Sequence, residues 1–129
     1  MIRHFETRNL KYSSEQMFDL VADIEAYPKF IPWCNDVKIT SRLADQNKGC
    51  EVLEANMGVS FKIISERFSS RVFLNPISKE ILVEYIAGPF KFLSNRWTFT
   101  SSADGSIVNF HVEFEFKSKL MQRLIGVVF

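Results

Sequence analysis

The sequence has few of the residue types on which most catalytic and metal sites depend. It holds two cysteines, Cys34 and Cys50, and two histidines, His4 and His111, among 129 residues. Two cysteines alone cannot build a disulfide framework or a four-ligand zinc site. We also find no HExxH, GxSxG, P-loop or dinucleotide-binding motif. The sequence therefore predicts free thiols, no metal site, no bound cofactor and no catalytic residue.

Long apolar runs and an excess of one charge are lacking as well. No continuous apolar stretch approaches the roughly 20 residues that span a bilayer, and the N-terminal segment has no apolar signal region. Sixteen basic and fifteen acidic residues give a net charge of +1. That balance argues against a DNA-binding protein that relies on bulk charge. We expect a cytoplasmic protein that folds as a single domain over residues 1–129.

The few polar groups that could be catalytic have simpler interpretations. His111, Glu113 and Glu115 fall on the polar face of the last predicted strand, where solvated side chains are more common than an acid/base pair. Cys34 follows Trp33 without an evident base beside it, so a small buried side chain is favoured over a nucleophile. A cyclase-like enzyme stays open as an alternative, because such a site can use scattered residues that leave no motif.

Phenylalanine, in contrast, is abundant. The chain has 13 Phe beside Tyr 3 and Trp 2, which suggests an apolar interior larger than the protein itself fills. The segment Tyr27–Cys34, which we call the aromatic corner, gathers three aromatic residues and two prolines within eight residues. Proline fixes its own φ and disfavours helix in the residue before it. Tyr27 should therefore end a helix, and Pro32 should close any short turn that begins at Pro28.

The spacing of apolar residues predicts the elements before the corner and directly after it. Residues 2–9 predict a strand. Ser13 and Gln16 match a capping box for a helix that stops before the corner. About six strands are predicted after the corner. One of them is Phe61–Leu74, whose apolar alternation changes phase, so we expect a single long strand with a bulge near residues 65–67.

The end of the chain gives the clearest alternation and then a change of period. From Val108 to Lys117 apolar and polar residues alternate without a break, which indicates a strand with one face on an apolar interior and one in water. Residues 118–129 follow a helical spacing, and Ser118 can cap that helix. The whole order predicts an α+β fold: a curved antiparallel sheet with two short N-terminal helices and a C-terminal helix on one face.

This order and the aromatic corner resemble the START/polyketide cyclase superfamily and its helix-grip fold. Within it, Tyr27–Cys34 is similar to the motif of the coenzyme Q-binding protein family, which groups mitochondrial ubiquinone-binding START proteins with bacterial RatA-type proteins. Gly88–Leu93, Trp97–Phe99 and Phe114–Leu120 support the match, which covers essentially the whole chain. Members usually have a longer C-terminal helix that continues past Phe129. The resemblance therefore predicts either an incomplete cavity lid or a truncated form of the chain.

The resemblance implies an apolar cavity that holds ubiquinone or a related prenyl lipid, in a carrier or chaperone that supports respiratory electron transport without catalysis. Some bacterial members are instead described as toxins that block the joining of ribosomal subunits, and similarity does not separate these two functions. A quinone ring needs flat apolar walls with polar groups near its carbonyls. Asn95 can supply such a group. The residues expected to form the wall or rim of the cavity are Tyr27, Phe30, Trp33, Tyr85, Phe90, Trp97, Phe99, Phe110 and Phe114.

Two alternatives remain open for these apolar residues. The Phe residues of the later strands fit an ordinary core as well as a ligand wall. The segments 28–31, 88–92 and 121–125 each place apolar side chains beside a cation, which suits contact with an anionic membrane surface but also fits loops anchored inward. We therefore add peripheral contact with the inner membrane, and contact with a ribosomal subunit, as expected partners to test.

Overall fold

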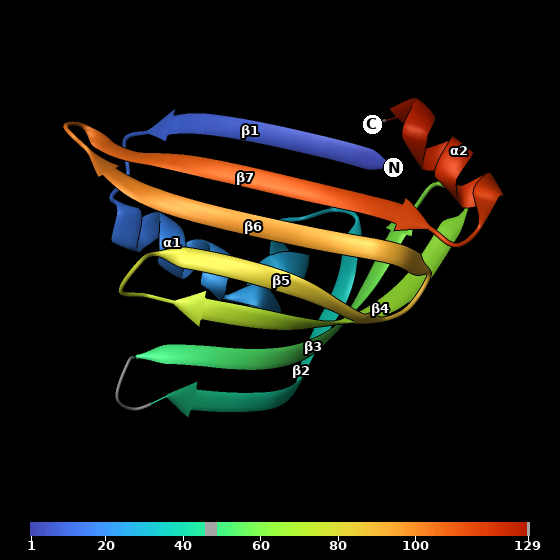
Figure 1. The fold of residues 1–129 in the computed structure, drawn as a ribbon, viewed down its shortest axis with the longest axis horizontal. Helices are drawn as coiled ribbons and strands as arrows, with labels where there is room; N and C mark the ends of the chain where they lie inside the picture. Colours follow the sequence, from blue (N-terminus) through green and yellow to red (C-terminus); the bar gives the residue numbers. More distant parts are fainter. Residues whose placement is uncertain (46–48, 129) are drawn as a thin grey trace.

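The structure, a computed structural model, describes residues 1–45 and 49–128. Within these residues seven strands form one antiparallel sheet in the order β1-β7-β6-β5-β4-β3-β2 (Figure 1). The sheet curves, and its two edge strands, β1 and β2, are consecutive strands in the sequence with α1 and η1 between them. The elements are β1 (Ile2–Leu10), α1 (Ser14–Ala22), the 3₁₀ helix η1 (Ile24–Lys29), β2 (Cys34–Asp45), β3 (Cys50–Phe61), β4 (Ile64–Asn75), β5 (Glu80–Ala87), β6 (Phe90–Ser102), β7 (Gly105–Phe116) and α2 (Lys119–Val128). The predicted fold class is confirmed.

The first helix begins where the sequence predicts. The backbone N–H of Gln16 donates to the Ser13 hydroxyl at 3.1 Å, and the Ser13 N–H donates to the Gln16 side-chain oxygen at 2.9 Å. This capping box satisfies two donors that a helix start leaves without partners. The apolar stripe of α1 then places Phe18 and Val21 on the sheet, where both are buried.

The prediction that Tyr27 ends the helical segment is wrong. The helix η1 runs from Ile24 to Lys29 and contains Pro28. Two successive turns make this helix: the Ala26 N–H closes the first on the Asp23 carbonyl, and the Phe30 N–H closes the second on the Tyr27 carbonyl. Pro28 is the first residue inside the second turn, where its missing N–H costs no bond.

The predicted long strand from Phe61 to Leu74 is also wrong. β3 ends at Phe61 and β4 begins at Ile64, and the two strands pair in an unbroken antiparallel register up to that pair. Lys62 and Ile63 form the two-residue turn, with Lys62 at φ 54°. The change of phase in the sequence is therefore a reversal of direction. Sequence reasoning missed it because the turn lacks the glycine or asparagine that usually marks a positive φ.

The last strand and the last helix follow their predictions. Val108, Phe114 and Phe116 of β7 are buried, whereas Asn109 on the opposite face is exposed. The Ser118 hydroxyl accepts from the Met121 backbone N–H at 3.3 Å at the start of α2. No helix among the described residues is long and apolar enough to cross a membrane.

Candidate functional site on the inner face of the sheet

The helices pack on one face of the sheet, which we call the inner face, and they divide its apolar residues into two clusters. In the first, Phe18 of α1 packs edge-on to Phe99 of β6, with ring centroids 5.7 Å apart. In the second, Met121 of α2 packs near Phe90 and Phe114. Figure 1 shows α1 and α2 over different ends of the sheet. A region of the inner face between the two clusters therefore has less helix over it.

A strip of half-buried residues crosses the sheet in this region. The register places Trp97 of β6 beside Phe110 of β7, and Asn95 beside Val112. Val83 of β5 pairs with Asn95 and extends the strip. The Trp97 and Phe110 rings are 4.6 Å apart. All five side chains keep partial exposure. We call them the middle strip. The Trp97 and Phe110 rings are tilted by 63° to each other, so a planar ligand ring can stack on the face of one ring while it contacts the other edge-on.

Asn95 supplies the polar group of the strip. Its amide nitrogen donates to the His111 carbonyl at 2.9 Å, and its side-chain oxygen accepts from the Trp97 indole N–H at 3.1 Å. An Asn amide has two N–H hydrogens and an oxygen with two lone pairs. Each end of the Asn95 amide can therefore make one more bond than the structure gives it here. The two bonds it already makes hold the amide next to the indole ring.

A second polar group lies on the same face at the edge strand. Cross-strand pairing puts Glu6 of β1 opposite Phe110 and His4 opposite Val112. The Arg8 guanidinium donates to the Glu6 carboxylate at 2.6 Å, and that hydrogen bond lowers the pKa of Glu6. Because Glu6 is held ionised and remains substantially exposed, it is suited to an ion pair and not to proton donation. Sequence reasoning missed these residues, since no local pattern distinguishes the inner face of β1.

A hollow opens next to the strip where β5 and β6 part. The two strands pair only as far as Glu84 and Ser94. Beyond that point the Tyr85 side chain reaches β6, where its hydroxyl accepts from the Phe90 backbone N–H at 3.1 Å. The hollow has a volume of ≈ 410 Å³. Its lining combines inner-face and outer-face side chains: Val83, Glu84, Tyr85, Lys91, Phe92, Leu93 and Ser94.

The structure divides the nine predicted site residues into three groups. Phe90, Phe99 and Phe114 are buried in the two clusters, so they are core residues here. The four half-buried members are Tyr27, Tyr85, Trp97 and Phe110. Of these, Trp97 and Phe110 lie in the middle strip. The remaining two, Phe30 and Trp33, are 54% and 50% exposed. The predicted wall is therefore narrower than the full set, and its use by a ligand stays a prediction.

The aromatic corner is fixed by its own contacts. The Tyr27 hydroxyl donates to the Val21 carbonyl of α1, and burial raises the pKa of this hydroxyl above its usual range. Tyr27 therefore joins the two helices and is already satisfied without a ligand. Cys34 is buried, and this burial, with the nearby Asp36 carboxylate, raises the pKa of its thiol. A raised pKa suits a packed thiol and opposes a nucleophilic one.

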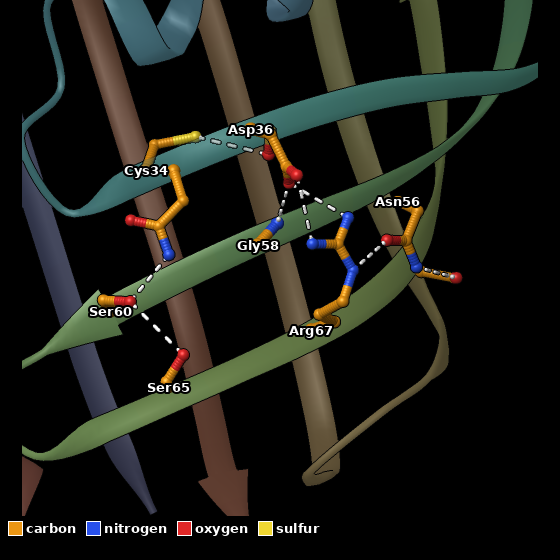
Figure 2. Close-up of polar contacts among 9 residues, drawn as sticks. Cys34, Asp36, Asn56, Gly58, Ser60, Ser65 and Arg67 are labelled. Atoms are coloured by element: carbon orange, nitrogen blue, oxygen red, sulfur yellow. Dashed lines mark hydrogen bonds and ion pairs between the residues drawn. The ribbon is translucent and has the colours of Figure 1, made fainter.

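A polar network on the outer face ties the strand after the corner to the next two strands (Figure 2). The Arg67 guanidinium binds both oxygens of Asp36, with Nη2–Oδ1 at 2.9 Å and Nη1–Oδ2 at 3.2 Å. Arg67 Nε also donates to Asn56 Oδ1 at 2.8 Å. This ion pair passes over Gly58, where an added Cβ would lie 2.7 Å from both partners. A side chain at position 58 would therefore displace the ends of the Arg67 and Asp36 side chains. The network holds β2 against β3 and β4.

The network predicts a pH dependence. The hydrogen bond from Arg67 lowers the pKa of Asp36 in the folded chain. Its stabilising contribution is thus present above the ordinary carboxyl pKa and is lost as the pH falls through the lowered value. We expect the stability difference between the wild type and Asp36→Asn to be constant near neutral pH and to shrink at acidic pH. Urea unfolding across a pH series measures it, and a difference that grows on acidification would contradict this assignment.

Comparison with known proteins gives the same family along nearly the whole chain. The family model described as polyketide cyclase / dehydrase and lipid transport matches residues 10–129. The ribosome association toxin RatA of Rickettsia prowazekii is 34% identical over 133 residues, covering 100% of this chain and 86% of that protein. The mitochondrial coenzyme Q-binding protein COQ10 homolog B of Xenopus laevis is 35% identical over 132 residues, covering 99% of this chain and 52% of that protein.

Solved structures agree on the fold. The solution structure of an 18 kDa protein from Caulobacter crescentus has a TM-score of 0.82 and 35% identity, covering 98% of this chain and 84% of that chain. An aromatase/cyclase from Streptomyces sp. R1128 has a TM-score of 0.66 and 15% identity, covering 91% of this chain and 69% of that chain. At that identity the second likeness concerns the fold alone.

Proposed function

This chain belongs to the polyketide cyclase / dehydrase and lipid transport family, within the START-like superfamily, and on that premise we propose that it binds ubiquinone or a related prenyl lipid without catalysis. The observation that carries the proposal is the middle strip. Trp97 and Phe110 form a half-buried aromatic pair, with their ring planes 63° apart, between the two packed clusters. Leaving such large side chains partly solvated costs stability unless a ligand covers them. The relatives named for coenzyme Q binding support the choice of ligand.

The chemistry of the strip suits a quinone ring. The ring is planar and apolar on both faces, so it can stack on the Trp97 indole with the tilted Phe110 ring beside it. Its carbonyl oxygens accept hydrogen bonds, and the Asn95 amide nitrogen, which donates one N–H to the His111 carbonyl, has a second N–H to donate. The prenyl tail needs only apolar surface, which Val83 and Leu93 provide toward the parting of β5 and β6. Recognition therefore needs one donor and no ionised group.

The proposed role is that of a carrier or chaperone that supplies the lipid to respiratory electron transport. No bond is made or broken in such a role. The charged groups of the inner face support this assignment: His4 and Glu6 lie at the edge strand, with side chains 44% and 40% exposed. General acids and bases work best when burial shifts their pKa toward neutrality, and Glu6 is shifted in the opposite direction by Arg8.

Mass spectrometry of bound lipid tests the proposal. Protein purified without detergent is extracted with organic solvent, and we expect a prenyl quinone in the extract. The emptied protein is then titrated with a short-tailed ubiquinone in equilibrium dialysis, and we expect saturable binding. An extract without prenyl lipid, together with no uptake in the titration, would overturn the proposal.

A second candidate function is an action on ribosomes. The relative named as a ribosome association toxin matches over 133 residues at 34% identity, and the coenzyme Q-binding relative matches over 132 residues at 35% identity. Similarity therefore favours neither name. Co-sedimentation with ribosomal subunits, and a loss of subunit joining on overexpression, discriminates between the two functions, because a lipid carrier has no reason to do either.

A further inference from the structure

We propose that the tip of the β3–β4 hairpin, Lys62 and Ile63, docks together with Phe30 and Trp33 on the surface of an anionic lipid bilayer. This inference rests on the proposed function in one respect: a prenyl lipid dissolves in bilayers, so its carrier must reach one. The hairpin tip lies outside the middle strip and takes no part in holding the lipid.

Ile63 is among the most exposed large apolar residues described. Its side chain is 89% exposed, and the hairpin that carries it ends at one end of the molecule (Figure 1). No packing in the folded chain requires an isoleucine at this position. A branched apolar side chain in water contributes nothing to the fold, whereas its transfer into an apolar layer is favourable. The position therefore fits contact with something outside this chain.

The backbone conformation at the first turn position is also one that lysine disfavours. Lys62 adopts φ 54°, the left-handed region that favours glycine and asparagine. Its ammonium group lies 5.8 Å from the centroid of the Phe61 ring. Glycine and asparagine are the residues most often found at such a turn position. Residues that conflict with local backbone preference often mark a function, and this conflict places a cation next to the exposed Ile63.

The aromatic corner is fastened to this hairpin. The Ser60 backbone N–H donates to the Trp33 carbonyl at 2.9 Å, and Asn35 Nδ2 donates to the Ser60 hydroxyl at 2.6 Å. Figure 2 shows Ser60 and Ser65 on the two strands of the hairpin, beside Cys34 of β2. The exposed Trp33 therefore lies next to the strands that carry the tip, and the exposed Phe30 precedes it by three residues at the end of η1. Together these residues, Phe30, Trp33, Lys62 and Ile63, form what we call the docking tip.

Charge selects an anionic partner. Lys29 follows the corner's proline and Lys62 is at the tip, and among the described residues neither makes an ion pair with an acid. Asp36, the acid that follows the corner, is neutralised by Arg67. Cations beside apolar and aromatic side chains are the combination that binds to the headgroup region of anionic bilayers.

A bilayer fits the docking tip better than a protein partner does. Stable protein interfaces bury about 800 Å² on each partner, more than a few projecting side chains supply. A bilayer surface instead deforms around a projecting tip, and each apolar side chain that enters it adds affinity separately. Its occupant is therefore a membrane surface rich in anionic lipid.

Flotation with vesicles tests the docking tip. Full-length protein is mixed with vesicles of phosphatidylcholine that contain phosphatidylglycerol, without quinone, and we expect it to float with them, and less so with pure phosphatidylcholine. Ile63→Ser should reduce the partition coefficient about tenfold, since one apolar side chain leaves the bilayer. The matched control is Ile77→Ser. Ile77 is 72% exposed in the β4–β5 turn at the other end of the molecule, and its replacement should leave binding unchanged.

A second variant separates membrane contact from folding. Lys62→Gly should weaken binding to the anionic vesicles and should not lower the melting temperature, because glycine fits φ 54°. Equal binding by wild type and Ile63→Ser, or equal loss in Ile77→Ser, would overturn the proposal. The proposal would also be overturned if the protein did not bind vesicles but bound ribosomal subunits in a way that depends on Ile63. Titration of Ile63→Ser with a short-tailed quinone tests the proposed function separately, and we expect the same affinity as for the wild type. If the wild type binds vesicles but no quinone, the result supports the docking tip and not the proposed function.

Discussion

Replacing Phe99 with alanine is expected to lower the free energy of unfolding by about 3–5 kcal/mol. Phe99 is 3% exposed, and it lies edge-on to Phe18 of α1 at 5.7 Å. Its ring also runs parallel to that of Trp97, with centroids 6.1 Å apart. Removing the ring leaves a cavity between the sheet and the helix, and neither neighbour can fill it without leaving its own contacts. Urea unfolding followed by far-UV circular dichroism measures the loss.

The control for this prediction is a phenylalanine on the outer face. Phe5 is 66% exposed and stacks on His111 with centroids 4.2 Å apart. Phe5→Ala should cost less than about 1 kcal/mol, because little surface is removed from water at that position. Similar losses for the two variants would show that the inner-face cluster around Phe99 is not the core of the fold.

Much of the fold could be predicted from local patterns. The alternation from Val108 to Lys117 identified β7 and its buried face, and Ser13 with Gln16 identified the start of α1. The two failures have different physical causes. Lys62 turns the chain without a turn residue, because the pairing of β3 with β4 overrules its local preference. Pro28 agrees with a local preference, because it is the first residue of a helical turn, where its missing N–H costs no bond.

The candidate site could be predicted only in part. Alternation predicted that Phe110 and Phe114 share the inner face of the last strand and that Trp97 and Phe99 share a face of the strand before it, and the predicted family is confirmed. Which of these are core and which remain partly open depends on where α1 and α2 lie on the sheet. That position is set by contacts between residues far apart in the sequence, such as Phe18 with Phe99. The division between wall and core therefore needed the structure.

Replacing Trp97 with alanine is expected to raise the dissociation constant for a short-tailed ubiquinone at least about tenfold, since a large apolar contact with the ring is lost. Because Trp97 is only half-buried, its removal should cost about 2–3 kcal/mol of stability, less than that of Phe99. The indole N–H also holds Asn95 in place at 3.1 Å. Trp97→Phe keeps an aromatic ring but loses the hydrogen bond to Asn95. Its affinity for the quinone should therefore lie between those of the wild type and Trp97→Ala.

The second tryptophan of the chain provides the matched control. Trp33 is 50% exposed at the aromatic corner and has no contact with the middle strip among those the structure describes. Trp33→Ala should therefore leave quinone affinity in equilibrium dialysis unchanged, and it should weaken binding to anionic vesicles. Equal affinities of Trp97→Ala and wild type for the quinone would contradict a ligand wall at the middle strip. Loss of quinone affinity in Trp97→Ala and loss of vesicle binding in Trp33→Ala would show that lipid binding and membrane contact use different parts of this small protein.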